Sequence, residues 1–390
     1  MSEAPKQHKD GLYIVHSCTS ISYSGLERYV VDLATWQKEQ GYTVEVFCRK
    51  RSLIHEECRK RDIRCWIINE KQGLSPLLIL KIGSRWRHLK QKCAEEGAEL
   101  TLHMHHAGEL RFHRLSLQNI AKKILQFHLW ITHRKRNIYH AWLYAALNAV
   151  WCSSESAKEQ LHKILPVAEK KIEVIPYGRK IKELKAHNKE EVRKKIRHTL
   201  RISEDHMVFL CISRIEKIKG IQELMDAFVS LAGRNKKVQL ILVGGPSPGN
   251  DEAQDFFIEI QDQLAGLSTE IKSRIHLMGF VPDSQKYYLA SDVYVLPSYE
   301  ECMSLALLDA LILGLPTIGT ESGGTPSVVI PESTGLLVPP QNENALLEAM
   351  ETVASGKLDL ALMSQNAATL TANLDEDTVF QKIIENYRTA

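Results

Sequence analysis

The sequence has no long hydrophobic run. Its longest apolar stretches, such as 77–80 and 305–308, fall far short of the roughly 20 residues that a membrane-spanning helix needs. The first ten residues are too charged for a secretory signal, so we expect a cytoplasmic chain. The eight cysteines form no C-x-x-C pair, and several lie within apolar runs, which favours buried reduced thiols over a disulfide framework. These absences argue against an integral membrane protein and a disulfide-rich secreted protein.

Two common phosphate-binding fingerprints are also missing. No G-x-G-x-x-G follows the first apolar run, and no G-x-x-x-x-G-K-[ST] occurs anywhere in the chain. Nicotinamide chemistry and P-loop ATP chemistry are therefore poor hypotheses.

The two halves of the chain carry opposite net charges. Residues 1–200 carry 37 Lys and Arg against 21 Asp and Glu, a net charge of +16, whereas residues 201–390 carry a net charge of -13. A basic half attracts phosphates, nucleic acid or an anionic membrane surface, so the two halves are expected to have different partners.

The chain of 390 residues, with 44% hydrophobic and 25% charged residues, is long enough for two globular domains. Short apolar runs alternate with helical patterns, which predicts parallel sheets covered on both faces. The first half opens with a strand at 11–16 and a helix at 26–40. Its further strands are predicted at 43–48, 64–68, 100–103, 123–127, 149–152 and 172–175, and those of the second half at 208–212, 238–243, 275–278, 293–296, 317–320 and 335–338.

Between the halves, residues 179–201 are basic, helix-prone and without strand character. We therefore predict an α/β protein with two Rossmann-like domains, 1–178 and 179–374. A final amphipathic helix is predicted at 375–388.

In the second half, polar motifs follow the predicted strands, where an open α/β sheet binds ligands. Arg214 and Lys219 lie five residues apart after the strand 208–212. Such a pair of cations can hold a diphosphate, although a solvated basic loop explains the same pattern. Gly244 and Gly324 belong to paired glycines at two other strand ends, where the backbone can approach a ligand or simply turn.

The segment 297–311 carries the most information. Its part from Ser304 reads as the start of an apolar helix, so the amides of residues 302–305 are predicted to form an anion site. Glu301 precedes this helix and Asp309 lies inside it. Buried carboxylates need donors, and sugar or ribose hydroxyls are suitable. The alternative is that Glu301 caps the helix and Asp309 has a backbone partner.

In this order the motifs resemble the family-four retaining glycosyltransferases of the GT-B fold, which show R-x4-K-G, a V-G-G strand end, E-x7-E and an S-x-G-G loop. The likeness extends over essentially the whole chain. The segment 24–28 looks like the G-G-x-E-R loop of that family, 127–128 like its central histidine loop, and 174–178 like its I-P-N-G linker.

The resemblance implies two Rossmann-like domains that face each other across a cleft, with the C-terminal segment 375–390 packed back on the first domain. It also implies a nucleotide-sugar donor bound by the second domain. In the matching positions, Arg214 and Lys219 would hold the diphosphate, Glu301 the hexose hydroxyls, and Asp309 the ribose. The remaining implied contacts are the backbone near Met303, Ser304 and Leu305, the glycines Gly244 and Gly324, and, from the first domain, Gly25 and His128, which would close over the sugar and acceptor.

The sequence departs from the family pattern in four places. Asp309 is one methylene shorter than the second glutamate of E-x7-E. Ser24 replaces a loop glycine, Tyr177 the linker asparagine and Ser327 a glutamate after the second glycine pair. These changes put ribose contact and full activity in question.

The resemblance implies transfer with retained anomeric configuration, without a protein nucleophile, a cofactor or a metal. The absence of a D-x-D run in a suitable loop is consistent with metal independence. His103, His105 and His106 invite a zinc interpretation, but no nearby cysteine or carboxylate completes a site, so we expect these histidines to line the acceptor side or to be structural.

Two segments of the basic half combine cations with aromatic residues: 81–92, around Trp86, and 111–142, around Trp130. They suit an anionic membrane surface or a phosphorylated lipid-linked acceptor, and solvated helix faces are the simpler explanation. No nucleic-acid-binding module is recognisable, so nucleic acid is not expected as a partner.

The sequence thus predicts a cytoplasmic hexosyltransferase, peripheral at the inner face of the membrane, that uses a nucleotide-diphosphate sugar, with a UDP-sugar favoured. Its acceptor would be a glycan or a lipid-linked molecule of envelope polysaccharide or lipopolysaccharide synthesis. The alternatives are a non-catalytic GT-B subunit that binds glycan or a partner glycosyltransferase, and a GT-B phosphorylase or nucleotide-sugar epimerase.

Overall fold

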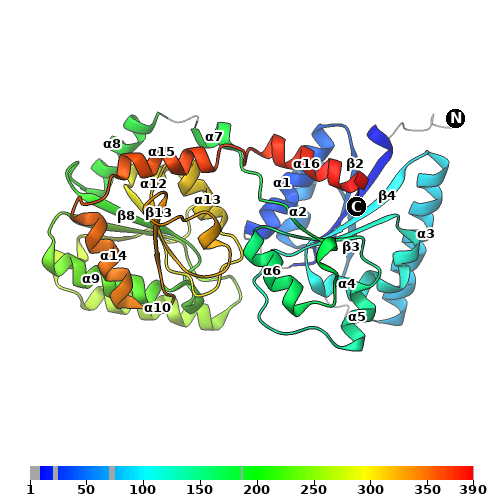
Figure 1. Ribbon diagram of the computed structural model, residues 1–390, viewed down its shortest axis with the longest axis horizontal. Helices are drawn as coiled ribbons and strands as arrows, with labels where there is room; N and C mark the ends of the chain where they lie inside the picture. Colours follow the sequence, from blue (N-terminus) through cyan, green and yellow to red (C-terminus); the bar gives the residue numbers. More distant parts are fainter. Residues whose placement is uncertain (1–8, 21–24, 70–74, 186–187, 390) are drawn as a thin grey trace. The chain divides into compact units, whose positions relative to one another are not determined.

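The computed structural model describes residues 9–20, 25–69, 75–185 and 188–389. The chain divides into two compact units, which are called unit 1 and unit 2 below. Unit 1 comprises residues 1–178 and 377–390, and unit 2 comprises residues 179–376. In each unit a parallel sheet lies between helices (Figure 1).

Unit 1 is built on a seven-stranded parallel sheet in the order β3-β2-β1-β4-β5-β6-β7. The chain extends the sheet from β1 in one direction and then crosses over to β4, so β1 and β4 meet at the point where the strand order reverses. The strands are β1 (Leu12–Ser17), β2 (Thr43–Arg49), β3 (Arg64–Ile68), β4 (Glu99–Met104), β5 (Lys122–Gln126), β6 (Ala149–Cys152) and β7 (Ile172–Val174).

The last helix of the chain belongs to unit 1. Its Phe380 packs edge-on against Tyr29 and Trp36 of the first helix, and Asp377 accepts a hydrogen bond from the Trp36 indole at 2.7 Å. Figure 1 shows this helix beside α1. The helices of unit 1 are α1 (Gly25–Glu39), α2 (Leu53–Lys60), α3 (Pro76–Glu95), α4 (Leu110–His113), α5 (Ile138–Tyr144), α6 (Glu155–Ile164) and α16 (Glu376–Thr389).

Unit 2 repeats this plan with a six-stranded parallel sheet in the order β10-β9-β8-β11-β12-β13. Here the order reverses between β8 and β11. The strands are β8 (Met207–Ile212), β9 (Val238–Val243), β10 (Ile275–Leu277), β11 (Val293–Leu296), β12 (Thr317–Thr320) and β13 (Gly335–Val338).

Two apolar cores cover the two faces of this sheet. One joins the sheet to α9, α10 and α14, and the other joins it to α8, α12, α13 and α15. The helices of unit 2 are α7 (Ile181–Lys185), α8 (Lys189–Leu200), α9 (Ile221–Arg234), α10 (Asp251–Gly266), α11 (Thr269–Lys272), α12 (Gln285–Ala290), α13 (Leu305–Ile312), α14 (Glu343–Ala354) and α15 (Leu360–Leu370).

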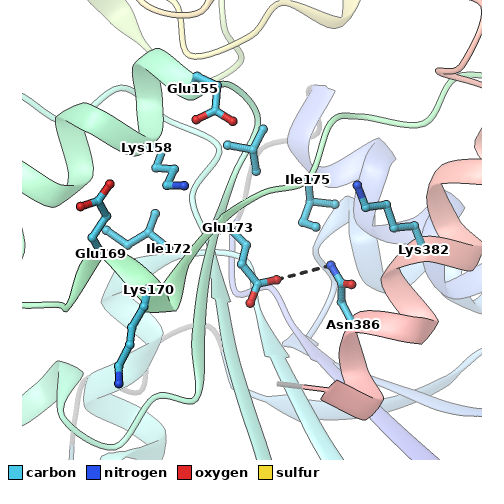
Figure 2. A pocket seen from close by; sticks show the side chains of 10 residues that line it. Glu155, Lys158, Glu169, Lys170, Ile172, Glu173, Ile175, Lys382 and Asn386 are labelled. Atoms are coloured by element: carbon cyan, nitrogen blue, oxygen red, sulfur yellow. Dashed lines mark hydrogen bonds between the residues drawn. The ribbon is translucent and has the colours of Figure 1, made fainter.

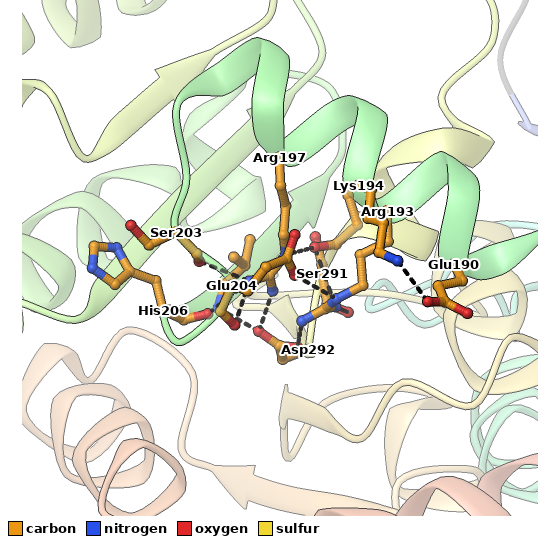
Figure 3. A network of polar contacts seen from close by, with 11 residues as sticks. Glu190, Arg193, Lys194, Arg197, Ser203, Glu204, His206, Ser291 and Asp292 are labelled. Carbon is orange, nitrogen blue, oxygen red and sulfur yellow. Dashed lines mark hydrogen bonds and ion pairs between the residues drawn. The ribbon is translucent and has the colours of Figure 1, made fainter.

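The basic segment that precedes β8 is partly structural. Arg197 of α8 is fully buried and pairs with Asp292 at 2.8 Å, while Arg193 binds the other oxygen of that carboxylate at 2.9 Å (Figure 3). Arg197 also donates to the carbonyl oxygens of Ser203 and Ala290. A buried charge is tolerated when its donors are satisfied in this way, so these arginines fasten α8 to the sheet.

The predicted α/β architecture is confirmed. Every strand expected from the sequence is present, with ends within one residue of the predicted ones. All eight cysteines lie in the described residues and are free, and all but Cys65 are buried. Within the described ranges, no helix combines the length and the hydropathy needed to cross a membrane.

Candidate functional site

The predicted donor-binding residues of unit 2 come together at one edge of its sheet. Arg214 and Lys219 follow β8, Gly244 follows β9, Glu301 follows β11, and Gly324 follows β12. Because the strands are parallel, these four loops leave the sheet at the same edge. The β8 and β11 loops flank the reversal of strand order, which is where open α/β sheets bind ligands.

An ion pair links two of these loops. The Lys219 Nζ donates to the Glu301 Oε2 at 2.6 Å, and the two side chains are only 14% and 16% exposed. An ammonium group has three donors, so Lys219 can orient Glu301 and still bind an anion. The Glu301 carboxylate is thereby held as a hydrogen-bond acceptor near the point where the strand order of unit 2 reverses.

Arg214 is the more open cation of the site. Its Nη1 donates to the Glu216 Oε1 at 2.8 Å and to the Ser247 Oγ at 3.0 Å, and the Ser247 hydroxyl also contacts that Glu216 oxygen. Nearly half of the Arg214 side chain, 48%, is exposed. Both contacts use one nitrogen, so the guanidinium keeps further N–H donors, in the fork geometry that binds phosphate oxygens.

Glycines hold the loops against one another. A Cβ added at Gly244, where φ is +144°, would lie 1.7 Å from the carbonyl oxygen of Ser213, and one added at Gly324 would lie 2.0 Å from that of Cys302. The close approach of backbone to backbone therefore explains both glycines without a ligand. It also joins the β9 loop to the β8 loop and the β12 loop to the β11 loop.

The start of α13 has the geometry of an anion site. Ser304 is the N-cap, and its Oγ accepts a hydrogen bond from the Leu307 amide at 3.2 Å. Met303 is buried just before the cap, and Leu305 opens the helix. The positive end of the helix dipole lies here, next to the loop that carries Glu301.

The Asp309 carboxylate forms an ion pair with an arginine of the same unit. Its two oxygens accept hydrogen bonds from the Nε and Nη2 of Arg179 at 2.6 and 2.7 Å. The side chains of Arg179 and Asp309 are 22% and 14% exposed. The role of Asp309 toward ribose stays a prediction. Arg179 stands directly after the predicted domain boundary, and no motif in the sequence singled it out.

In unit 1, His128 is held on both sides. Its Nε2 lies 3.1 Å from the His105 Nδ1 and its Nδ1 lies 2.7 Å from the Tyr177 hydroxyl. Burial lowers the pKa of His128 to about 3, so the ring is neutral near pH 7. Tyr177, noted in the sequence as a departure, thus has a structural role. Gly25 begins α1, and Ser24 lies outside the described residues.

The two basic segments differ in where they place their aromatic residues. Trp86, at the centre of the segment 81–92, is fully buried and donates from its indole to the His113 Nδ1 at 3.2 Å. It faces the core because the apolar side of α3 carries it inward. In the segment 111–142, by contrast, Trp142 is 43% exposed and packs under Arg114, whose guanidinium carbon lies 4.3 Å from the ring centroid.

Unit 1 also has a surface hollow, and none of the predicted site residues lines it. Lysine and glutamate side chains surround it, and the Glu173 Oε2 accepts a hydrogen bond from the Asn386 Nδ2 at 3.4 Å across it (Figure 2). Burial raises the pKa of Glu173. The charges are of both signs and mutually compensating, so the hollow has no clear ligand class.

Comparisons with known proteins agree with the geometry. Residues 23–182 match the model of the family described as "Glycosyltransferase Family 4", and residues 206–355 match that of "Glycosyl transferases group 1". A D-inositol 3-phosphate glycosyltransferase of Rhodococcus opacus is 28% identical over 197 residues, which are 50% of this chain and 43% of the relative. The chain spans about half the length of the curated relatives it matches.

Solved structures match the whole described fold. A crystal structure of Anabaena HepE in complex with UDP has a TM-score of 0.83 at 18% identity, over 97% of this chain and all of that one. A glycosyltransferase of Rickettsia africae has a TM-score of 0.83 at 20% identity, over 97% and 98% of the two chains. HepE has also been crystallised with UDP-glucose. With two family models covering well over half of its length, the chain belongs to the family-four glycosyltransferases of the GT-B fold.

Proposed function

We propose that this glycosyltransferase is a retaining, metal-independent hexosyltransferase that uses a nucleotide-diphosphate sugar. The observation that carries the proposal is the convergence of Arg214, Lys219 and Glu301 at the point where the strand order of unit 2 reverses, between β8 and β11. Two cations beside a fixed carboxylate suit a ligand that combines a diphosphate with a hydroxyl-rich sugar.

The chemical demand on this site is the departure of the nucleoside diphosphate. As the bond between the anomeric carbon and the phosphate oxygen breaks, negative charge grows on the diphosphate. Arg214, Lys219 and the N-terminus of α13 stabilise this charge, and one well-placed donor contributes about 3 to 4 kcal/mol. The acceptor oxygen bonds to the same face of the anomeric carbon, and its proton passes to the departing phosphate.

Glu301 orients the sugar in this proposal. An ionised carboxylate is an acceptor only, so it binds the hexose hydroxyls while Lys219 fixes its position. Gly25 and His128 remain predicted contacts of the sugar and acceptor, and the neutral imidazole of His128 serves as a hydrogen-bonding group rather than as a charge.

We favour a UDP-sugar as donor and a glycan or lipid-linked acceptor in envelope polysaccharide or lipopolysaccharide synthesis. Support for the donor comes from HepE, which has been crystallised with UDP and with UDP-glucose. A thermal-shift panel of UDP, GDP, ADP and their sugars identifies the base, because a ligand at about 100 times its Kd stabilises the protein by about 2.7 kcal/mol.

The test is the double substitution of Arg214 and Lys219 by alanine. We expect transfer from the nucleotide sugar to fall by at least about 1000-fold, because two donors to the leaving group are lost. The matched control is Lys236→Ala, which removes a cation of the same unit that is 83% exposed, and its turnover should equal that of the wild type. Unchanged turnover in the double variant would reject the proposal.

A non-catalytic GT-B subunit is the second candidate function. It is favoured by one observation, the pairing of both Asp309 oxygens with Arg179 instead of their being open to a ribose. A subunit of this kind would bind a nucleotide or glycan without turnover. Slow release of the free nucleotide from a nucleotide sugar, lost in the double variant above, would exclude it.

For the membrane, we propose peripheral contact through α5 of unit 1. Ile138 is 90% exposed there, and Tyr139 and Trp142 are also exposed beside the cations of the segment 134–136. Apolar side chains next to basic ones suit the interface of an anionic bilayer. Sedimentation with vesicles containing anionic lipid should pull down the wild type, and Ile138→Ser should weaken it; equal sedimentation of both would contradict this contact.

A further inference from the structure

Three histidines of unit 1 converge at the reversal of its strand order. His16 of β1 lies directly opposite His103 of β4 in the sheet register, and His105 follows two residues later. Side chains of opposed residues, and of residues two apart, share one face of a sheet. The register therefore stacks the three imidazoles on one face, at the carboxyl ends of two adjacent strands.

The rings are close and shielded from water. One ring nitrogen from each of His16, His103 and His105 lies within 4.8 Å of those of the other two. The His16 Nδ1 and the His105 Nε2 are 3.0 Å apart. His16 and His103 are 0% exposed and His105 is 1% exposed.

In each imidazole, the second ring nitrogen, called the outer nitrogen below, has a hydrogen-bond partner outside the three-histidine cluster. The His16 Nε2 lies 2.7 Å from the Gln37 Oε1, the His103 Nδ1 lies 2.7 Å from the Tyr387 hydroxyl, and the His105 Nδ1 lies 3.1 Å from the His128 Nε2. Metal-binding histidines show this pattern, because donation from the outer N–H fixes the tautomer and directs the other lone pair inward.

One of the nitrogens that the three rings offer to the cluster, that of His103, lacks a hydrogen-bond partner in the described residues. The Nε2 of His103 is buried and has no hydrogen-bond partner among the described residues. A buried polar atom without a partner is costly, and in native structures it calls for an explanation. A cation bound between the three rings would satisfy it.

We propose that His16, His103 and His105 bind one zinc ion through His16 Nδ1, His103 Nε2 and His105 Nε2. Zinc takes imidazole nitrogens at about 2.0 to 2.1 Å in tetrahedral sites, so the three nitrogens need only draw together by small side-chain rotations. An imidazole that donates a hydrogen bond from one ring nitrogen keeps a lone pair on the other nitrogen, and that lone pair binds zinc. Magnesium and calcium are disfavoured, because they prefer oxygen ligands.

The fourth position has a neighbouring candidate in Gln126, the last residue of β5. Its amide is buried, neither of its polar atoms makes a hydrogen bond of ordinary length in the described structure, and it lies close enough to His103 to interact with that ring. The sequence around residues 103–106 offers neither cysteine nor carboxylate as a further ligand, which is why no metal is predicted from it. His16 is far away in sequence and joins the cluster only through the pairing of β1 with β4.

The zinc ion is structural and takes no part in the proposed transfer chemistry. It ties the ends of β1 and β4 together and sets the proton on His128. With zinc on its Nε2, His105 donates from Nδ1 to the His128 Nε2, so His128 must carry its own proton on Nδ1, facing the Tyr177 hydroxyl. The metal thus determines which nitrogen of His128 is the donor.

The test begins with the full-length wild-type protein, stripped with a chelator and titrated with zinc. We expect one zinc ion per chain to be retained after dialysis, no retention of magnesium, and an X-ray absorption spectrum with nitrogen ligands. Failure to retain zinc would overturn the proposal. So would sulfur ligation, because the thiols of Cys48, Cys58 and Cys65 neighbour one another and are the alternative zinc ligands in this unit.

The substitution His103→Gln sharpens the test. It should lower zinc affinity by more than about 100-fold, since loss of an outer partner alone costs 10- to 100-fold. The matched control is His113→Gln, which changes a histidine that is equally buried but contacts Ser17 and Trp86 instead, and it should bind zinc like the wild type. Equal affinity in His103→Gln and the wild type would contradict the proposal. If His103→Gln does not fold, the stoichiometry and spectrum of the wild type decide.

Discussion

The two units share one sheet plan but differ in the polar groups at the carboxyl ends of their strands. Unit 2 presents charged pairs, Lys219 with Glu301 and Arg214 with Glu216, whose side chains are between 13% and 48% exposed. Unit 1 presents neutral imidazoles that are almost entirely buried. Charged groups that keep contact with solvent can exchange their partners for a phosphate, whereas buried neutral rings are fixed. We therefore expect ligands to exchange in unit 2 and the imidazoles of unit 1 to act as fixed positioning groups.

The units can be followed separately in experiments. All six tryptophans of the chain lie before residue 152, within unit 1. Tryptophan fluorescence therefore reports the folding of unit 1, while hydrogen exchange of peptides from residues 179–376 reports that of unit 2.

Among single substitutions in unit 2, the largest effect is expected at Glu301. Glu301→Gln removes the charge that neutralises Lys219, so UDP should bind equally well or more tightly, while turnover falls about 100-fold because the sugar loses its ionised acceptor. Calorimetry of UDP binding and a transfer assay separate the two quantities. A parallel loss of UDP affinity and turnover would show that Glu301 does not act on the sugar.

The next effect concerns the structural arginine of unit 2. Arg197→Met should destabilise unit 2 by about 3 kcal/mol, because Asp292 loses one of its two cations and several buried carbonyl groups lose a donor. Hydrogen exchange of β8 and β11 measures it. The control is Lys194→Ala on the same helix, whose exposed pair with Glu190 should contribute nothing measurable. Similar exchange in the two variants would mean that the buried network does not hold α8.

A smaller effect is expected at Asp309. Asp309→Asn leaves the partly buried guanidinium of Arg179 without its countercharge, so unit 2 should lose about 2 kcal/mol of stability, as seen in hydrogen exchange of α13. Tryptophan fluorescence of unit 1 should not change. If Asp309→Asn instead weakens UDP binding with no loss of stability, Asp309 serves the nucleotide rather than the fold.

The smallest effect is a pH dependence in unit 1. Burial lowers the pKa of His113 to about 3 from its ordinary 6.5, so the unfolded chain gains a proton below pH 6.5 that the folded chain does not. Stability is therefore lost as the pH falls from 6.5 toward 3. Between pH 7 and pH 5, the loss attributable to His113 is about 2 kcal/mol.

Urea unfolding followed by tryptophan fluorescence at the two pH values checks this prediction. In His113→Gln the difference in unfolding free energy between pH 7 and pH 5 should shrink by that amount. An identical pH dependence in the variant and the wild type would show that His113 can be protonated in the folded unit.

The sequence predicted what depends on local pattern. The apolar run at 208–212 and the loop after it placed Arg214 and Lys219 at a strand end, and the structure has them there. It could not predict contacts that depend on strand order, such as the ion pair of Lys219 with Glu301, 82 residues away, or the register that opposes His16 to His103. Trp86 was misjudged because its neighbours are basic, although its own helix face is buried.

The most direct measurement of the central claim is hydrogen exchange of the wild-type protein with saturating UDP, GDP or ADP. We predict that at least one of these nucleotides slows exchange in the loops 213–220 and 299–306 of unit 2. Exchange that stays unchanged in both loops with all three nucleotides, or that slows only in unit 1, would contradict the assignment of the donor site to these strand ends.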